Sequence, residues 1–140
     1  MLGKAFLDTN VLIYLYAGDD ESKRSIVCRV LDDHDCVTSI QALSETSNVL
    51  YKKFSLDANQ IKTYLDNIES VCISVIPVHR DTINTALVLK NRYGYAYYDC
   101  LMLASALDSN CKTIYTEDMN NGQIIEDTLM IINPFQNKET

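Results

Sequence analysis

Four acidic residues of the 140-residue sequence occupy positions where carboxylates could act together. Asp8 ends the apolar run Ala5-Phe6-Leu7, and Asp118 follows the run Thr113-Ile114-Tyr115. In open α/β sheets, ligands bind beyond the carboxyl ends of the strands, so both positions suit a functional site. Asp99 stands at the expected start of a helix, where a carboxylate is equally well explained as a helix cap.

Glu45 is the fourth acid, and its position is costly unless it has a partner. On a helix that contains Ala42 and Val49, Glu45 shares their face, because they lie three residues before it and four after it. A carboxylate on a partly apolar face lowers stability unless it is paired or binds a metal. A position at the rim, with the side chain reaching water or a lysine, is the ordinary alternative.

Gathered at one edge of a sheet, these four carboxylates would form a site for divalent metal ions. Close like charges raise one another's pKa values and oppose folding, and a divalent ion removes that penalty. Oxygen ligands favour Mg²⁺ or Mn²⁺, and the sequence has no His and Cys set typical of zinc. Such a site activates water for attack on phosphorus, so no side-chain nucleophile is required. His34 and His79 are predicted to be surface or structural residues.

The elements that must position these acids follow from an alternation of short β-branched runs and amphipathic patterns. Strands are predicted at 5–7, 36–37, 71–78, 113–115 and 130–132, and helices near 9–16, 22–31, 38–50, from 57, 82–94 and 98–107. This order predicts one α/β domain over residues 1–135, with a central, mostly parallel sheet flanked by helices. A short polar tail is expected at 136–140.

Three helix starts are predicted from polar residues that precede apolar periodic segments. Thr9 or Asn10 would cap the first helix, and the segment from Thr38 to Gln41 has the form of a capping box. The segment from Asp57 to Gln60 is a stronger capping box, because apolar residues flank it on both sides.

Composition excludes several classes of protein. Hydrophobic residues make up 47% and charged residues 22%, which is typical of a globular domain, and four Gly and two Pro exclude a collagen-like or linker sequence. With 12 Lys+Arg against 19 Asp+Glu the net charge is −7, which argues against a protein that coats nucleic acid through a basic face. It does not exclude an enzyme whose metal ions carry the positive charge, since two divalent ions would change −7 to −3.

The cysteines and the N-terminus indicate a reducing compartment. The cysteines are Cys28, Cys36, Cys72, Cys100 and Cys111. Their number is odd and no pair has C-x-x-C spacing, so free thiols are predicted rather than disulfides or a zinc ribbon. The segment Met1-Leu2-Gly3-Lys4 lacks the charged region, long apolar stretch and cleavage site of a signal peptide, and the longest apolar run, 11–17, is far below the roughly 20 residues that cross a bilayer. We therefore expect a soluble cytoplasmic protein with no membrane partner.

Five segments occur in order along nearly the whole chain. They are Phe6-Leu7-Asp8-Thr9-Asn10, Leu43-Ser44-Glu45, Tyr98-Asp99-Cys100-Leu101, Thr116-Glu117-Asp118-Met119 followed by Gly122-Gln123, and Asn133-Pro134-Phe135. In this order and at this spacing, the segments resemble the motifs of the PIN-domain family, and most closely those of the ribonuclease toxins of VapBC-type toxin–antitoxin modules. Thr116 stands where many relatives have Ser, which preserves the hydroxyl group.

The resemblance implies an endoribonuclease that depends on Mg²⁺ or Mn²⁺. The catalytic and metal-binding acids would be Asp8, Glu45, Asp99 and Asp118, with one ion at the three aspartates and a second, weaker ion near the glutamate. The supporting residues would be Thr9, Asn10, Thr116 and Glu117, the last as a fifth acid at the rim. The resemblance also implies a homodimer and a cognate VapB-like antitoxin whose basic segment covers the acids.

An RNA substrate would need a basic margin despite the net charge. The candidate residues are Lys23, Arg24, Arg29, Lys52, Lys53, Lys90 and Arg92, and each could equally lie on a solvated helix face. The tyrosines Tyr93, Tyr95, Tyr97 and Tyr98 could stack on bases or pack in the core or a dimer interface. Leu12, Tyr16 and Leu50 are candidates for apolar contacts with an antitoxin.

Other readings of the sequence remain open. A phosphotransferase of the haloacid-dehalogenase type would need D-x-D, but Asn10 occupies the second position. A receiver domain would need paired acids after its first strand and a lysine after a late strand, but the late strand ends in Thr116-Glu117-Asp118. An RNA-processing nuclease outside a toxin–antitoxin pair and a PIN-like binding module without catalysis are further alternatives. The binding module should have lost acids, and all four are present.

Overall fold

Within residues 2–136, the sheet has six strands in the order β3-β2-β1-β4-β6-β5. The computed structural model describes residues 2–136. The strands are β1 Lys4–Leu7, β2 Asp35–Ser39, β3 Ser74–Ile76, β4 Thr113–Tyr115, β5 Ile124–Ile125 and β6 Leu129–Ile132. The helices are α1 Thr9–Tyr16, α2 Glu21–Asp33, α3 Ile40–Phe54, α4 Ala58–Val71, α5 Arg80–Tyr93 and α6 Tyr97–Asp108.

The sheet is parallel except for β5, which pairs antiparallel with β6. The chain starts at β1, adds β2 and β3 on one side, and then returns to place β4 on the other side of β1. The boundary between β1 and β4 is therefore the point at which the strand order reverses, where ligands bind in open α/β sheets. The prediction of one α/β domain with a mostly parallel sheet is confirmed.

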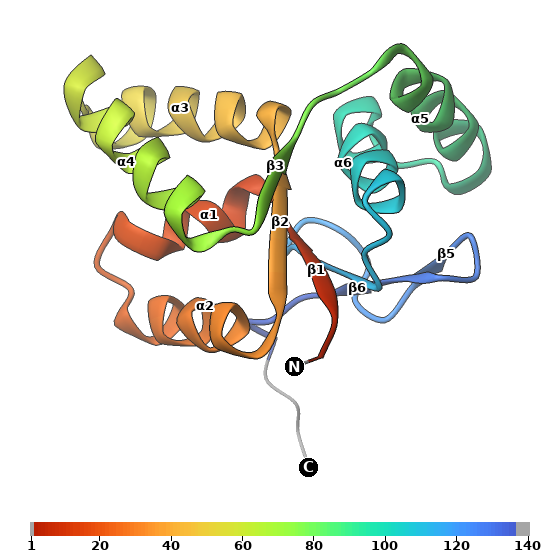
Figure 1. The fold of residues 1–140 in the computed structure, drawn as a ribbon, viewed down its shortest axis with the longest axis horizontal. Helices are drawn as coiled ribbons and strands as arrows, with labels where there is room; N and C mark the ends of the chain where they lie inside the picture. The colour runs from red at the N-terminus through yellow and green to blue at the C-terminus, as the bar shows by residue number, and fades with distance from the viewer. Residues whose placement is uncertain (1, 137–140) are drawn as a thin grey trace.

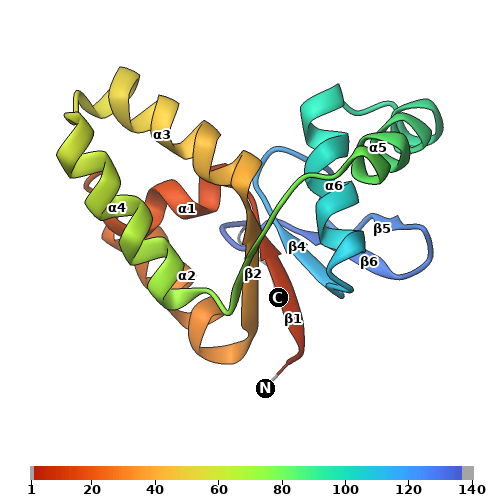
Figure 2. The same ribbon diagram turned by 45° about the horizontal axis from the view of Figure 1, so that its top comes forward.

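The helices form two groups on opposite sides of the sheet. Figure 1 shows α1 to α4 on one side of β1 and β2, and α5 and α6 on the other, and Figure 2 shows the same division from a second direction. This division follows from right-handed crossovers, because connections that run in opposite directions along a sheet place their helices on opposite faces.

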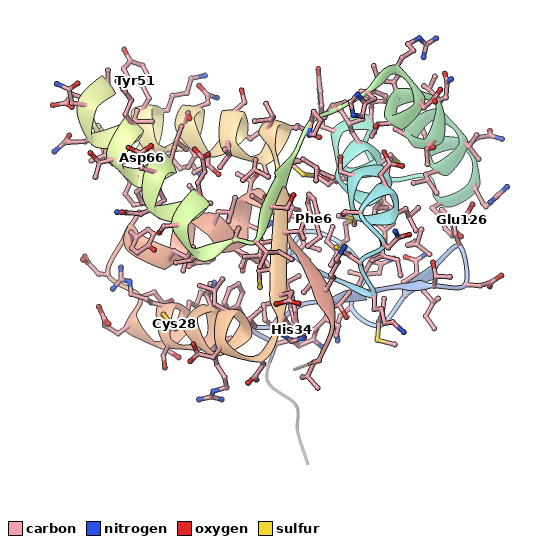
Figure 3. All side chains as sticks on the ribbon, in the orientation of Figure 1. Phe6, Cys28, His34, Tyr51, Asp66 and Glu126 are labelled. Atoms are coloured by element: carbon pink, nitrogen blue, oxygen red, sulfur yellow. The ribbon has the colours of Figure 1, made fainter. Side chains whose placement is uncertain are left out.

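One continuous hydrophobic core lies between these layers. Phe6 of β1 lies near the centre of the molecule (Figure 3), and its side chain is fully buried. The other large side chains with almost no exposure are Leu7, Leu12, Leu50, Ile68, Leu89, Met102, Leu103, Ile114, Ile125, Leu129 and Ile131. The central strands β1 and β4 are therefore packed on both faces, so the backbone at their carboxyl ends is held rigidly.

Two predicted helix caps are wrong by one or two residues. Asp8, not Thr9 or Asn10, is the N-cap of α1, and its carboxylate accepts a hydrogen bond from the Thr9 backbone N–H at 2.7 Å. Ser39, not Thr38, caps α3, because β2 continues to Ser39 and the Thr38 hydroxyl donates instead to the Leu7 carbonyl at 2.9 Å. The predicted Asp57 to Gln60 capping box at α4 is confirmed.

The cysteines and His34 agree with the predictions from the sequence. All five cysteines are free, and His34 is a buried structural residue whose ring nitrogens lie 3.1 Å from the Val30 carbonyl and 3.2 Å from the Tyr115 hydroxyl. Within residues 2–136, no helix is long and apolar enough to span a membrane. The predicted polar tail at 136–140 lies, apart from Gln136, outside the described residues.

Candidate active site

The register of β1 and β4 brings Asp8 and Thr116 side by side. The last residue pair of the two strands is Leu7 and Tyr115, and the Asp8 backbone N–H donates to the Tyr115 carbonyl at 3.1 Å. One residue further on, the Thr116 hydroxyl donates to Asp8 Oδ2 at 2.8 Å. Asp8 is 4% exposed, so its carboxyl group, at the point where the strand order reverses, is almost completely shielded from water.

Asn10 in the first turn of α1 fixes the loop that follows β4. Its Nδ2 donates to Asp118 Oδ2 at 2.8 Å and to the Thr116 hydroxyl at 3.1 Å. Its Oδ1 accepts a hydrogen bond from the Glu117 backbone N–H at 3.2 Å. The side chain of Asn10 therefore orients Asp118 toward Asp8 and prevents the loop from moving away from the sheet.

Glu45 reaches the site from α3 and is held by two hydrogen bonds. Its Oε2 accepts from Gln41 Nε2 at 2.6 Å, and its Oε1 accepts from the Thr9 hydroxyl at 3.4 Å. Gln41 Nε2 also donates to the backbone carbonyl of Tyr98 at 3.2 Å, next to Asp99. Gln41 therefore links the helix that carries Glu45 to the helix that carries Asp99.

Sequence reasoning missed this role of Gln41. The spacing of four residues between Gln41 and Glu45 was a usable signal, because such residues are neighbours on a helix. The Oε1 atom of Gln41 is buried without a hydrogen-bond partner among the described residues. The two acceptors on the amide nitrogen therefore set the orientation of this side chain.

The acids meet in an open pocket of about 430 Å³. Its lining residues are Asp8, Thr9, Asn10, Ile13, Tyr14, Glu45, Val49, Lys53, Phe54, Asp99, Glu117 and Asp118. The four predicted catalytic acids thus come together from four separate segments: the end of β1, α3, α6 and the loop after β4. Of the predicted supporting residues, Thr116 lies beneath the pocket, and Thr9, Asn10 and Glu117 line it.

Burial and mutual repulsion disfavour the ionised forms of aspartates in this pocket. Burial raises the pKa of Asp8 from 3.8 to about 7, against the lowering effect of hydrogen bonds from Thr116 and Thr9, and the charges of Asp99 and Asp118 raise it further. The pKa of Asp99 is also raised, first by burial and then by the charges of Asp118 and Glu45. Any cation that entered the pocket would be stabilised by the same charges.

The donor atoms of the pocket suit a hard divalent cation. Among residues 2–136, no three His, Cys, Asp or Glu side chains are close enough together to hold one ion. Mg²⁺ keeps several of its waters and needs only one or two carboxylates. Asp8 and its neighbours offer carboxylate oxygens, so the chemistry of the site fits Mg²⁺ or Mn²⁺.

The model of the PIN-domain family matches residues 5–122. The chain belongs to the PIN-domain family. A search of curated proteins finds no match.

Several solved structures share the fold of this PIN domain over most of the chain. A toxin–antitoxin complex from Klebsiella pneumoniae has a TM-score of 0.70 and 19% identity, and covers 94% of this chain and 98% of its own. VapC20 of Mycobacterium tuberculosis, a toxin that cleaves the sarcin–ricin loop, has a TM-score of 0.65 and 20% identity, with 81% and 89% covered. VapBC2 of Rickettsia felis, bound to a DNA fragment from its promoter, has a TM-score of 0.68 and 17% identity, with 93% and 99% covered.

Lys23 contacts two residues that line the pocket of this PIN domain, Tyr14 and Glu117. Its Nζ pairs with Glu117 at 3.1 Å and donates to the Tyr14 hydroxyl at 3.0 Å. It also lies over the rings of Tyr14 and Phe135, 4.4 and 5.0 Å from their centroids. Lys23 therefore neutralises Glu117 and fixes it at the rim of the pocket.

The other predicted substrate-binding cations have different surroundings. Lys53 lines the pocket, and within residues 2–136 it is the one basic residue that does so, while Lys52 is exposed next to it. Arg24 donates to the carbonyls of Leu15 and Gly18 and pairs with Glu21, so it caps the C-terminal end of α1.

Arg92 lies in another part of the molecule. It pairs with Glu126, which lies near α5 and the β5–β6 end of the sheet (Figure 3). The structure therefore does not bring Arg92 together with the acids.

Two predicted antitoxin contacts are wrong. Leu12 and Leu50 are completely buried, because they belong to the faces of α1 and α3 that pack in the core. Tyr16 is 43% exposed. The apolar wall of the pocket is instead formed by Ile13, Val49 and Phe54.

Proposed function

We propose that this PIN domain is a Mg²⁺- or Mn²⁺-dependent endoribonuclease and acts as the toxin of a VapBC-type toxin–antitoxin pair. One observation carries the proposal: four carboxylates from four separate segments line one pocket at the reversal of strand order. They are Asp8, Glu45, Asp99 and Asp118. The similar fold of VapC20, which cleaves the sarcin–ricin loop, supports RNA as the substrate.

Different side chains would bind the two ions. One or two of the aspartates Asp8, Asp99 and Asp118 would bind one ion directly, with water in its remaining positions, and Glu45 would contribute to a second ion. When bound, the ions supply an activated water molecule and neutralise the charge that develops on the leaving oxygen. The hydroxyl of Thr116 and the backbone N–H of Thr9 keep both oxygens of Asp8 oriented, so little reorganisation is needed during the reaction.

RNA binding would depend on these ions. Five carboxylates and a single lysine, Lys53, line the described pocket, so a phosphate group is repelled until cations occupy it. Lys53, on the last turn of α3, would contact a neighbouring phosphate at the rim. This arrangement would allow a chain whose net charge is −7 to bind and cleave RNA.

The same pocket suits an antitoxin segment with basic and apolar residues. A basic side chain would pair with the acids, while apolar side chains would pack on Ile13, Val49 and Phe54. The structural relatives from Klebsiella and Rickettsia are toxin–antitoxin assemblies, which supports such a partner. A homodimer and a cytoplasmic location are the further expectations for such a toxin, and sedimentation analysis of the purified protein tests the first.

The catalytic proposal is tested with a pair of matched Asp→Asn variants. Asp99 lines the pocket, whereas Asp66 is exposed on α4 (Figure 3) and does not line it. Wild type and Asp66→Asn should cleave single-stranded RNA with Mg²⁺ or Mn²⁺ and lose activity in EDTA. Asp99→Asn should be inactive while its circular dichroism spectrum remains unchanged. Equal cleavage by both variants, or cleavage in EDTA, would contradict the mechanism.

Metal binding has an independent readout in thermal stability. Mn²⁺ at about 100 times its dissociation constant should stabilise wild type and Asp66→Asn by about 2.7 kcal/mol, and Asp99→Asn much less. No stabilisation of wild type would favour a PIN-like binding module without catalysis.

The toxin assignment is tested in cells. Induction of wild type should arrest growth, and induction of Asp99→Asn should not. Co-expression of a small DNA-binding protein from a neighbouring gene should restore growth. Growth unaffected by wild type that is active in vitro would point instead to an RNA-processing nuclease.

A further inference from the structure

The four tyrosines near Asp99 have different environments. The Tyr93 hydroxyl donates to Glu126 Oε2 at 2.9 Å and accepts from the Glu126 backbone N–H at 2.9 Å. The Tyr95 hydroxyl bonds to Gln123 and accepts from the Asn120 backbone N–H at 3.1 Å.

Tyr97 and Tyr98 begin α6, and only the second presents its ring to solvent. Tyr97 is half-buried against the core, and its ring meets that of Tyr98 edge to face at 5.2 Å between centroids. Tyr98 is 64% exposed and immediately precedes Asp99. Packing against Tyr97 limits the orientations of the Tyr98 ring. The exposed face of this ring is therefore held beside the acids.

Tyr98 lies at a second cavity, of about 330 Å³, within the roughly 300–1,000 Å³ of small-ligand pockets. Its lining residues are Gln41, Ser44, Glu45 and Tyr98. Glu45 lines both cavities and therefore forms the wall between them. A polymer held at the acids would reach this second cavity with its next unit.

We propose that this second cavity is a nucleobase subsite, in which a base of single-stranded RNA adjacent to the scissile phosphate stacks on Tyr98. The inference rests on the proposed function and adds which group of the RNA occupies the cavity next to the acids. Bases stack readily on aromatic side chains in single-stranded nucleic-acid sites.

The chemistry of the walls favours a base over a phosphate or a carboxylate. Glu45 is the one charged residue that lines the described cavity, and it would repel an anion. The amide nitrogen of Gln41 is already shared between Glu45 and the Tyr98 carbonyl, so Gln41 positions the cavity walls. The exposed hydroxyl of Ser44 is then the group that can donate to or accept from the edge of a base.

The subsite implies a particular pattern of sequence preference. Stacking accepts any base, because every base has an aromatic face, and one hydroxyl discriminates weakly. Cleavage should therefore show a modest preference at the nucleotide beside the cut, and this preference should change when Tyr98 or Ser44 is replaced.

The matched control is Tyr51, which is 67% exposed toward the C-terminal end of α3 (Figure 3) and lines neither cavity. Wild type, Tyr98→Leu, Tyr98→Trp and Tyr51→Leu are assayed on short unstructured RNA of mixed sequence with Mn²⁺. Steady-state kinetics and the ends of the fragments are determined. Mn²⁺-dependent thermal stabilisation is measured in parallel to show that the acids remain intact.

Tyr98→Leu should raise KM between about 5-fold and about 150-fold with little change in kcat, and should alter the fragment ends. Tyr98→Trp and Tyr51→Leu should keep the KM of wild type. Ser44→Leu, which fills the cavity from α3, should raise KM as well and provides a second test through another element.

Two results would overturn the subsite. If wild type cleaves but Tyr98→Leu and Ser44→Leu share its KM and fragment ends, the subsite is wrong and the nuclease assignment stands. If wild type neither cleaves RNA nor gains stability from Mn²⁺, both proposals are wrong.

Discussion

Replacing Asp8 by asparagine should stabilise the metal-free protein at neutral pH, although it should abolish cleavage. Asp8 is almost completely buried, and its pKa is raised from 3.8 to about 7, mainly by burial. In the unfolded chain Asp8 loses its proton near pH 4, whereas in the folded chain it keeps the proton until pH is near 7. Unfolding therefore releases a proton over this interval, and the free energy of unfolding falls as pH rises.

The magnitude follows from the two pKa values. The difference between about 7 and 3.8 corresponds to about 4 kcal/mol, at about 1.4 kcal/mol per pKa unit. This is an upper bound, because local relaxation and water reduce the penalty of burying a charge. An asparagine at position 8 does not titrate, and its side-chain oxygen can still accept from the Thr9 N–H. The stability difference between Asp8→Asn and wild type should therefore be small at pH 4 and approach this bound above pH 7.

Urea unfolding followed by circular dichroism measures this difference. Both proteins are unfolded at several pH values between 4 and 8 in EDTA, with Asp66→Asn as a control that should follow wild type. Excess Mg²⁺ or Mn²⁺ should then stabilise wild type more than Asp8→Asn and reduce or reverse the difference. A difference that stays constant between pH 4 and 8 in EDTA would refute the argument that burial raises the pKa of Asp8.

Three further predictions concern Gln41, the end of α3 and two cysteines. Gln41→Leu removes a hydrogen bond to Glu45 and should weaken Mn²⁺-dependent activity by about 10- to 100-fold, measured by titrating the metal in the cleavage assay. Ser55 ends α3 with φ of 56°, so Ser55→Gly should raise the free energy of unfolding by about 1 kcal/mol in urea, and an unchanged midpoint would contradict this. Cys28 is exposed, and should react with a disulfide reagent in the native protein, whereas Cys36, whose pKa burial raises to about 12, should react only after unfolding.

Much of the fold could be predicted because local pattern and global architecture agree. Parallel strands buried on both faces leave short apolar runs, and the helices between them carry amphipathic patterns. The two-residue strand β5 was missed, because a segment as short as Ile124–Ile125 has no measurable periodicity. The helix caps were displaced by one or two residues, since Ser39 and Asp8 are distinguished from their neighbours by backbone conformation rather than by residue type.

The candidate site was predictable to the extent that topology places it. Acids at the ends of neighbouring parallel strands must meet, so Asp8 and Asp118 followed from the strand pattern. The environments of the basic residues did not follow, because they depend on contacts distant in sequence. Arg92 pairs with Glu126 across 34 positions, and Lys23 pairs with Glu117 across 94. Such pairings become visible only when the chain is folded.

The position of β6 has a consequence for the synthesis of this protein. Thr116, which holds Asp8 in place, donates its backbone N–H to the carbonyl of Ile132 at 3.0 Å, and Ile132 is the last residue of the last strand. A growing chain has made Asp8, Glu45 and Asp99 long before this strand leaves the ribosome. We therefore expect the site around Asp8 to become ordered in the nascent polypeptide only after β6 has left the ribosome and paired with β4.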